Sequence, residues 1–203
     1  MRLHHRKDNA MKTATDAKTP DRDWLKTYYY LRFAVSAIWV ALAFTVAKTM
    51  PSLAAVMLVA YPAWDALANY LDASRSGGLT RNKTQMLNFV VSVVTAIAVT
   101  AILPHGMHAV LQIFGVWAVL SGLFQLLTGV RRWTSYGAQW AMILSGAQSG
   151  LAGAHMLSKA AGTAPVGIAD IAPYAAFGAF YFLISAVSLT ISGVRGRAKA
   201  VAA

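Results

Sequence analysis

Three polar side chains in the second apolar segment of the chain share one helical face. Asp65, Asn69 and Asp72 are spaced by four and three residues, so in an α-helix they project from the same side. At a rise of 1.5 Å per residue, Asp65 lies about 10 Å from Asp72, which stands at the charged end of the segment. Arg32 enters the first apolar segment at a similar depth and is the expected partner of Asp65. Ionised side chains inside a membrane are costly and mark functional sites.

Three hypotheses fit Arg32 and Asp65. The first is a structural ion pair that locks two helices together. The second is a protonatable or ion-coordinating site in which Asp65 changes state. The third places Asp65 against an aqueous vestibule. Further amides either line a cavity or hydrogen-bond across a helix seam: Asn88, Gln112, Gln125, Gln139 and Gln148.

Three histidines fall on the side of the membrane opposite the predicted cytoplasmic one. His105 and His108 lie between the third and fourth apolar segments, and His155 lies near the end of the fifth. Histidine titrates near pH 6.5, so these residues are candidates for pH sensing. A His-x-x-His pair with a third histidine is also a weak metal-binding pattern. Both hypotheses need the three rings to converge, and the alternative is that they are ordinary loop histidines.

Motifs that would identify an enzyme are missing from the sequence. There is no cysteine, and all seven acidic residues are aspartates. The phosphate-binding GxxxxGK[ST] loop, the zinc motif HExxH and the nucleophile motif GxSxG are absent. We therefore expect a non-enzymatic protein with no catalytic residue, no metal and no cofactor.

The composition is that of an integral membrane protein. The chain is 57% hydrophobic and 12% charged, whereas soluble domains carry about 25% charged residues. A spanning helix needs roughly 20 apolar residues, and the runs here are too long and too uniformly apolar for barrel strands. The predicted fold is an all-α bundle of six transmembrane helices, at residues 28–47, 52–71, 86–103, 109–130, 138–157 and 174–194.

The basic residues predict the orientation of these spans. All of the 18 lysines and arginines except Lys48 and Lys159 fall on one side, which the positive-inside rule places in the cytoplasm. We expect a multi-pass protein of the bacterial inner membrane with both termini cytoplasmic. Its expected partners are the bilayer and anionic lipids at the cytoplasmic face, and not nucleic acid. The predicted domains are a flexible basic tail (1–26), the membrane domain (27–196) and a short cytoplasmic tail (197–203).

An internal repeat is indicated by the second helix of each predicted hairpin. The pattern WxxxSG at 117–122 returns as YxxxSA at 181–186, and a weaker match starts at Trp64. We therefore predict three repeated helical hairpins, formed by spans one and two, three and four, and five and six.

Small residues mark candidate helix seams. Gly115, Gly122 and Gly129 are spaced by sevens, and Gly146 and Gly150 form a small-x-x-x-small pair on the fifth span. Close backbone approach drives helix association in lipid. These faces are predicted to pack within the chain, with a homo-oligomer interface as the alternative.

The segment GVWAVLSGLFQLLTGVRRW followed by WAMILSGAQSGLAGAHML resembles the HdeD family of short-repeat membrane proteins. The residues that carry the resemblance are Gly115, Trp117, Gly122, Gln125, Leu126, Arg131, Arg132, Leu144, Gly146, Gly150 and Gly153. The resemblance implies a bacterial inner-membrane protein of six spans, with a link to acid resistance in some members, and it supplies no catalytic residue. The basic tail and the acidic second span depart from the family.

Three functional hypotheses follow. The first is a non-enzymatic protein of the HdeD type that supports acid or envelope stress tolerance. The second is a small ion- or proton-coupled transporter or channel that uses Asp65 and Arg32. The third is a membrane scaffold whose basic tail binds anionic lipid or a partner protein.

Overall fold

The computed structural model describes the backbone of residues 22–131 and 139–201, and side chains within 23–127, 130 and 143–194. This part of the chain is helical. Two short 3₁₀ helices, η1 (Leu103–His105) and η2 (Ile168–Asp170), lie in connections. The six long helices are α2 (Arg22–Phe44), α3 (Pro51–Arg75), α4 (Lys83–Ile102), α5 (Met107–Arg131), α6 (Gln139–Ala160) and α7 (Ala172–Val201).

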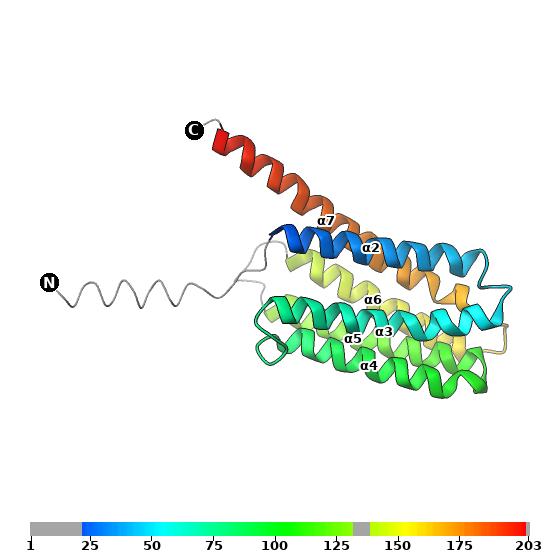
Figure 1. Ribbon diagram of the computed structural model, residues 1–203. Coiled ribbons are helices and arrows are strands. Elements are labelled where there is room, and N and C mark those ends of the chain that lie inside the picture. Colours follow the sequence, from blue (N-terminus) through cyan, green and yellow to red (C-terminus); the bar gives the residue numbers. More distant parts are fainter. Residues whose placement is uncertain (1–21, 132–138, 202–203) are drawn as a thin grey trace.

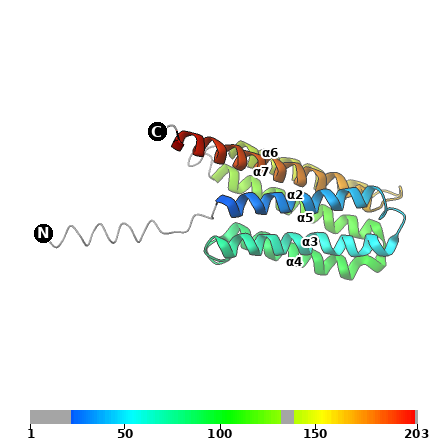
Figure 2. The same ribbon diagram turned by 45° about the horizontal axis from the view of Figure 1, so that its top comes forward.

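Successive helices run antiparallel, so the bundle has two distinct ends (Figure 1). The start of α2, the end of α7 and the α3–α4 loop lie at one end, here called the terminal end. The α2–α3, α4–α5 and α6–α7 connections lie at the other, here called the connection end (Figures 1 and 2). The six long helices lie where the six apolar segments were predicted.

The expected tails are shorter than predicted. Residues 22–26 belong to α2 and residues 197–201 belong to α7, so both segments are helical. Lys26 and Asp23 pair within the first turn of α2, with 3.0 Å between Nζ and Oδ1. The rest of the predicted basic tail lies outside the described residues, as do the side-chain surroundings of Gly129.

The closest helix pairs are not the predicted hairpins. Helix α5 packs most extensively against α6, α2 against α7, and α3 against α4. Within the expected pairs, α4 packs moderately against α5, whereas α2 touches α3, and α6 touches α7, only sparsely. The contact of α2 with α7 brings the first and last described helices together, so that each of the six long helices contacts the next one along the chain and the last contacts the first. The internal repeat stays a prediction.

Among the described residues, five helices are long and apolar enough to cross a membrane, namely Asp23–Phe44, Pro51–Arg75, Lys83–His105, Met107–Leu127 and Ala172–Val194. Helix α6 has 22 residues, about 33 Å at 1.5 Å per residue, which spans a hydrocarbon core of about 30 Å. Its polar residues Ser145, Gln148 and Ser149 line the interior cavity of the bundle. Its outer face is apolar, with Leu151 72% exposed. Lipid is the solvent that suits such an outer surface.

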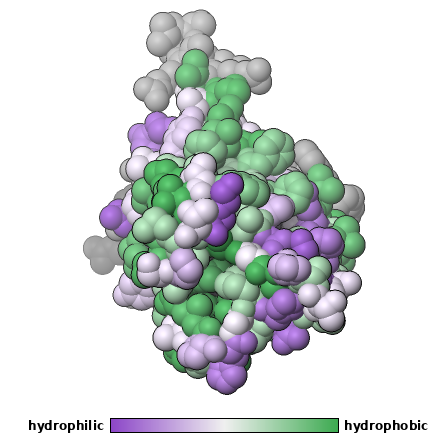
Figure 3. Space-filling model, turned by 90° about the vertical axis from the view of Figure 1, so that its right-hand side faces the viewer, coloured by the Kyte–Doolittle hydropathy of each residue, from purple (hydrophilic) through white to green (hydrophobic). Residues whose placement is uncertain are grey.

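An apolar core fills the half of the bundle nearest the connection end. Trp39 lies 4.8 Å from Tyr61 between ring centroids, and the rings of Phe114 and Trp117 are 5.7 Å apart. The buried Trp39 indole donates to the backbone oxygen of Met57 at 2.9 Å. Hydrophilic residues are spread over the surface of this end among apolar ones (Figure 3). The polar groups of the interior therefore gather in the opposite half.

Glycines bring α5 and α6 into backbone contact. A Cβ atom on Gly122 would lie 2.6 Å from the backbone oxygen of Gly146 and 2.7 Å from the backbone nitrogen of Gly150. One on Gly153 would lie 2.6 Å from the oxygen of Gly115. These small residues thus form a seam inside the chain, where a Cβ atom on Gly122, Gly146 or Gly153 would hold the helices apart.

Candidate functional site

The Asp65 carboxylate joins α2, α3 and α4. Its Oδ1 atom accepts from the Nη2 atom of Arg32 on α2. Its Oδ2 atom accepts from Asn69 Nδ2 at 3.0 Å and from the Ser92 hydroxyl of α4 at 2.8 Å. The Trp117 indole of α5 donates to the Ser92 hydroxyl at 3.2 Å. Donors from three side chains thus surround the two carboxylate oxygens, and Arg32 supplies the opposite charge.

Arg32 is held on several sides. Its Nη1 atom donates to the Tyr28 hydroxyl at 3.1 Å, and that hydroxyl donates to the backbone oxygen of Ala68 at 3.3 Å. The Phe182 ring of α7 covers the guanidinium, with 4.1 Å from Cζ to the ring centroid, a cation–π contact. Only 13% of the Arg32 side chain and 21% of the Asp65 side chain is exposed. Because both groups are mostly shielded from water, each depends on the other for charge compensation.

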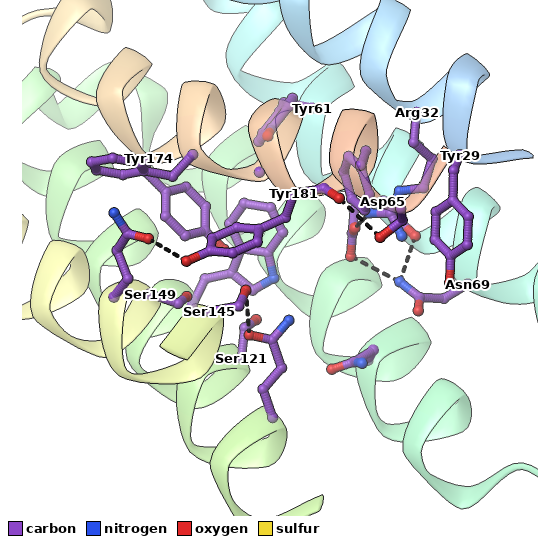
Figure 4. A pocket seen from close by; sticks show the side chains of 18 residues that line it. Tyr29, Arg32, Tyr61, Asp65, Asn69, Ser121, Ser145, Ser149, Tyr174 and Tyr181 are labelled. Atoms are coloured by element: carbon purple, nitrogen blue, oxygen red, sulfur yellow. Dashed lines mark hydrogen bonds and ion pairs between the residues drawn. The ribbon is translucent and has the colours of Figure 1, made fainter. Parts of the chain in front are cut away.

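The ion pair forms part of the wall of a cavity of about 400 Å³. All six long helices contribute side chains to this wall, which point toward one another in Figure 4. The lining residues are Tyr29, Arg32, Tyr61, Asp65, Asn69, Asn88, Trp117, Ser121, Gln125, Ser145, Gln148, Ser149, Tyr174, Phe177, Gly178, Tyr181, Phe182 and Ser185. Small-molecule sites have volumes of about 300–1,000 Å³. The cavity therefore has the size and the polar lining of a binding site.

Amides and hydroxyls form the side of the cavity opposite the ion pair. The Tyr181 hydroxyl of α7 donates to Gln148 Oε1 of α6 at 2.8 Å, across the sparse α6–α7 contact. Ser145 of α6 donates to Gln125 Oε1 of α5 at 3.3 Å. Ser149 donates to a backbone oxygen of α5 at 2.9 Å. This wall carries hydrogen-bonding groups but no charge.

The structure brings together three of the four residues of the predicted polar site. Arg32, Asp65 and Asn69 lie together on the cavity wall. Asp72 lies apart, nearer the terminal end, where it accepts from Gln85 Nε2 of α4 at 3.2 Å. Of the predicted hypotheses, an ion pair and a place on a cavity both describe Asp65.

Three of the five flagged amides, Asn88, Gln125 and Gln148, line the cavity. Gln112 lies exposed on the outside of α5. The side chain of Gln139 lies outside the described residues.

The three histidines lie at the connection end but do not form a cluster. His108 Nε2 lies 3.1 Å from the backbone oxygen of Ala164, which joins the start of α5 to the α6–α7 connection. His105 and His155 are exposed. Within the described side chains, no three His, Cys, Asp or Glu residues lie close enough together to hold a metal ion. A pH-sensing role for these histidines stays a prediction.

Comparison with known families gives one match. Residues 90–158 match the family described as a short repeat of unknown function (DUF308). HdeD belongs to this short-repeat family, so the match agrees at that level with the resemblance in the sequence. The DUF308 stretch runs from α4 to near the end of α6 and contains the glycine seam, but neither Arg32 nor Asp65. No curated protein and no solved structure matches the chain.

The sequence did not single out most of the aromatic and hydroxyl groups of the site. Ser92 completes the shell of Asp65, and Phe182 covers Arg32. Trp117, Ser121, Tyr181 and Ser185 appeared in the sequence only as repeat positions, and all four line the cavity. Recurrence of an aromatic and a hydroxyl residue four positions apart was therefore the available signal.

Proposed function

We propose that this protein is a non-enzymatic, multi-pass transporter or channel of the inner membrane that passes a small polar solute through the central cavity. The observation that carries the proposal is a polar cavity lined by all six helices of an otherwise lipid-adapted bundle. A bundle selected for stability alone has no need of such a space, because polar groups buried without partners cost free energy. Transport sites lie near the middle of membrane bundles, between helices of repeated units.

The proposed orientation places the terminal end in the cytoplasm. Arg75, Arg81 and Lys83 lie in or beside the α3–α4 loop at this end, together with the start of α2 and the end of α7 (Figure 1). Lys48 and Lys159 lie at the connection end. This distribution supports cytoplasmic termini and contact of the terminal end with anionic lipid headgroups. The apolar core would then close the cavity on the outer side.

Solute entry into proteoliposomes tests the proposal. The full chain is reconstituted, the vesicles are preloaded with unlabelled sorbitol, gluconate or glucosamine, and entry of the same radiolabelled compound is measured. Ser185→Trp fills part of the cavity. Val187→Trp is its matched control, because Val187 is 40% exposed on the outer side of α7. Within the described part of the chain, the Ser185 hydroxyl donates to a backbone oxygen of its own helix, so its replacement breaks no described hydrogen bond between helices. Entry above that of protein-free vesicles, reduced by Ser185→Trp alone, is expected; its absence for all three compounds contradicts the proposal.

The ion pair needs a test that separates transport from stability. Asp65→Asn leaves the shielded Arg32 charge without compensation, so we expect a loss of about 3–5 kcal/mol in the free energy of unfolding. The double variant Arg32→Gln/Asp65→Asn removes both charges and should regain most of that loss. A stable double variant with reduced solute entry supports a transport role. A stable double variant with unchanged entry would show that the pair serves only to join α2 to α3.

Acid tolerance is a second candidate function, favoured by the DUF308 match and its relation to HdeD. We expect that a strain without the gene survives exposure to low pH less well than its parent. Restoring the wild-type gene should recover survival, and restoring Ser185→Trp shows whether the cavity is involved. Equal survival of the deletion strain and its parent removes this candidate.

A further inference from the structure

The cavity is electrically balanced. Among its lining residues, the charged side chains are Arg32 and Asp65, and they are bound to each other. The remaining shell of Asp65 consists of Asn69 and Ser92, which carry no charge. A solute with a net charge would find no unpaired counter-charge among the lining residues, which is unfavourable. The site thus selects against anions and cations.

Three amide groups remain available to a solute. Gln125 and Gln148 use their Oε1 atoms as acceptors for Ser145 and Tyr181, and within the described structure their amino groups have no partner. The Asn88 side chain has no hydrogen bond there. An amide presents both donors and acceptors, and a hydroxyl group does the same. Solute hydroxyls are therefore suited to satisfy these groups.

Aromatic rings alternate with the amides and hydroxyls around the cavity. Trp117 and Tyr174 lie 5.7 Å apart between ring centroids, and Phe177 lies on the same helix as Tyr174. Ring faces pack against the C–H surface of a solute while amides bind its polar edge. The cavity of about 400 Å³ has room for roughly 13 water-sized groups at about 30 Å³ each. A hexose or a hexitol has that size and that division between C–H faces and hydroxyl edges.

We propose that the solute is an uncharged polyhydroxy compound, a sugar or a polyol, bound by Gln125, Gln148 and Asn88 and packed against the aromatic side chains of the cavity wall. The inference rests on the proposed function, because it names the substrate class of the same cavity. The Arg32–Asp65 pair adds no net charge to the cavity and holds its wall in place. The amides of α4, α5 and α6 form hydrogen bonds with the hydroxyl groups of the solute.

Binding to the full chain in lipid nanodiscs tests the substrate class. Titration with glucose, sorbitol, gluconate and glucosamine is followed by tryptophan fluorescence and by the thermal unfolding midpoint. These compounds share one carbon skeleton length and differ in charge. We expect saturable binding of at least one neutral compound, and at least tenfold weaker binding of the anionic and cationic ones. Stronger binding of gluconate or glucosamine, or binding of none of the four, overturns the assignment.

Variants locate the binding. Gln125→Leu should weaken binding of the neutral compound about tenfold. Gln112→Leu, at the exposed outer side of the same helix, should leave it unchanged. Should Gln125→Leu fail to fold, Gln125→Asn keeps an amide but shortens its reach and should also weaken binding. Equal binding by wild type and both Gln125 variants overturns the assignment of this residue and the site.

The binding experiment and the transport experiment can contradict the substrate class and the transport proposal independently of each other. Selective binding of glucose or sorbitol without entry into proteoliposomes contradicts the transport proposal and leaves the substrate class standing. Entry of gluconate or glucosamine in preference to the neutral compounds supports transport and refutes the substrate class.

Discussion

Replacing Gly122 by alanine should force α5 and α6 apart. The new Cβ atom would lie 2.6 Å from the backbone oxygen of Gly146 and 2.7 Å from the backbone nitrogen of Gly150. Neither atom belongs to a side chain that can rotate away, so the two helices themselves must move. The same seam contains the Gly115–Gly153 approach, which would loosen with it.

The expected cost follows from two opposing effects. Overpacking a close contact costs about 1–3 kcal/mol. Alanine in place of glycine within a helix recovers about 0.5–1 kcal/mol, because the unfolded chain loses conformational freedom. The net range is about 0–2.5 kcal/mol, so Gly122→Ala should lower the free energy of unfolding by up to about 2.5 kcal/mol.

Gly150→Ala is the matched control on the same seam. A Cβ atom at Gly150 would meet nothing within 4 Å, so only the gain of about 0.5–1 kcal/mol remains. The free energy of unfolding of both variants is measured by reversible denaturation in mixed micelles with the wild type alongside. If Gly122→Ala is as stable as Gly150→Ala, the backbone contact between α5 and α6 does not exist in the form described.

Two further contacts give predictions for stability. Asp170→Asn removes the ion pair to Lys159 but keeps an acceptor for the backbone nitrogen of Gly167, which lies 2.7 Å from Oδ2 of Asp170. The free energy of unfolding should fall by about 0.5–1 kcal/mol in low salt and by less in 1 M salt. A loss that does not change with salt would show that charge is not its source. Trp39→Phe removes the buried hydrogen bond from the indole N–H to the backbone oxygen of Met57. The free energy of unfolding, measured by denaturation, should fall by about 1–3 kcal/mol. An unchanged unfolding midpoint would contradict the role of this hydrogen bond in closing the connection end.

The helices could be predicted because their signals are local. Length and hydropathy locate a spanning segment without knowledge of its neighbours, and Pro51 begins α3 as an N-terminal proline commonly does. The ends of α2 and α7 were missed because charged residues beyond the bilayer lack an apolar signal although they remain helical. Low hydropathy in α6 has a tertiary cause, since its polar residues face the cavity.

The Arg32–Asp65 contact was also predictable, because two opposite charges at similar depth in neighbouring spans have few other partners. Ser92 and Phe182 were not, because serine and phenylalanine occur throughout membrane helices and nothing local says which of them faces inward. Whether such a residue faces inward depends on which helices pack together. The sequence favoured consecutive hairpins, whereas α2 pairs with α7, and this non-local contact places Phe182 over Arg32.

The residues of α3, α5 and α7 that line the cavity include sets spaced by four. These are Tyr61, Asp65 and Asn69 on α3, Trp117, Ser121 and Gln125 on α5, and Phe177, Tyr181 and Ser185 on α7. Such spacing keeps each set on one helical face. The sets do not begin at the positions that the sequence comparison aligned, because the α3 set begins three residues before Trp64 and the α7 set begins four residues before Tyr181. The internal repeat therefore stays a prediction.

The charge pair departs from this threefold arrangement. Only the α3 set contains a charged residue, and it is paired with Arg32 of α2. A repeat copied three times would supply the aromatic and hydroxyl lining by itself, and a bundle of uncharged helices avoids the cost of placing ions in the membrane. The pair lies outside the residues of the DUF308 match. Its removal by the double variant tests what the two charges contribute to the cavity.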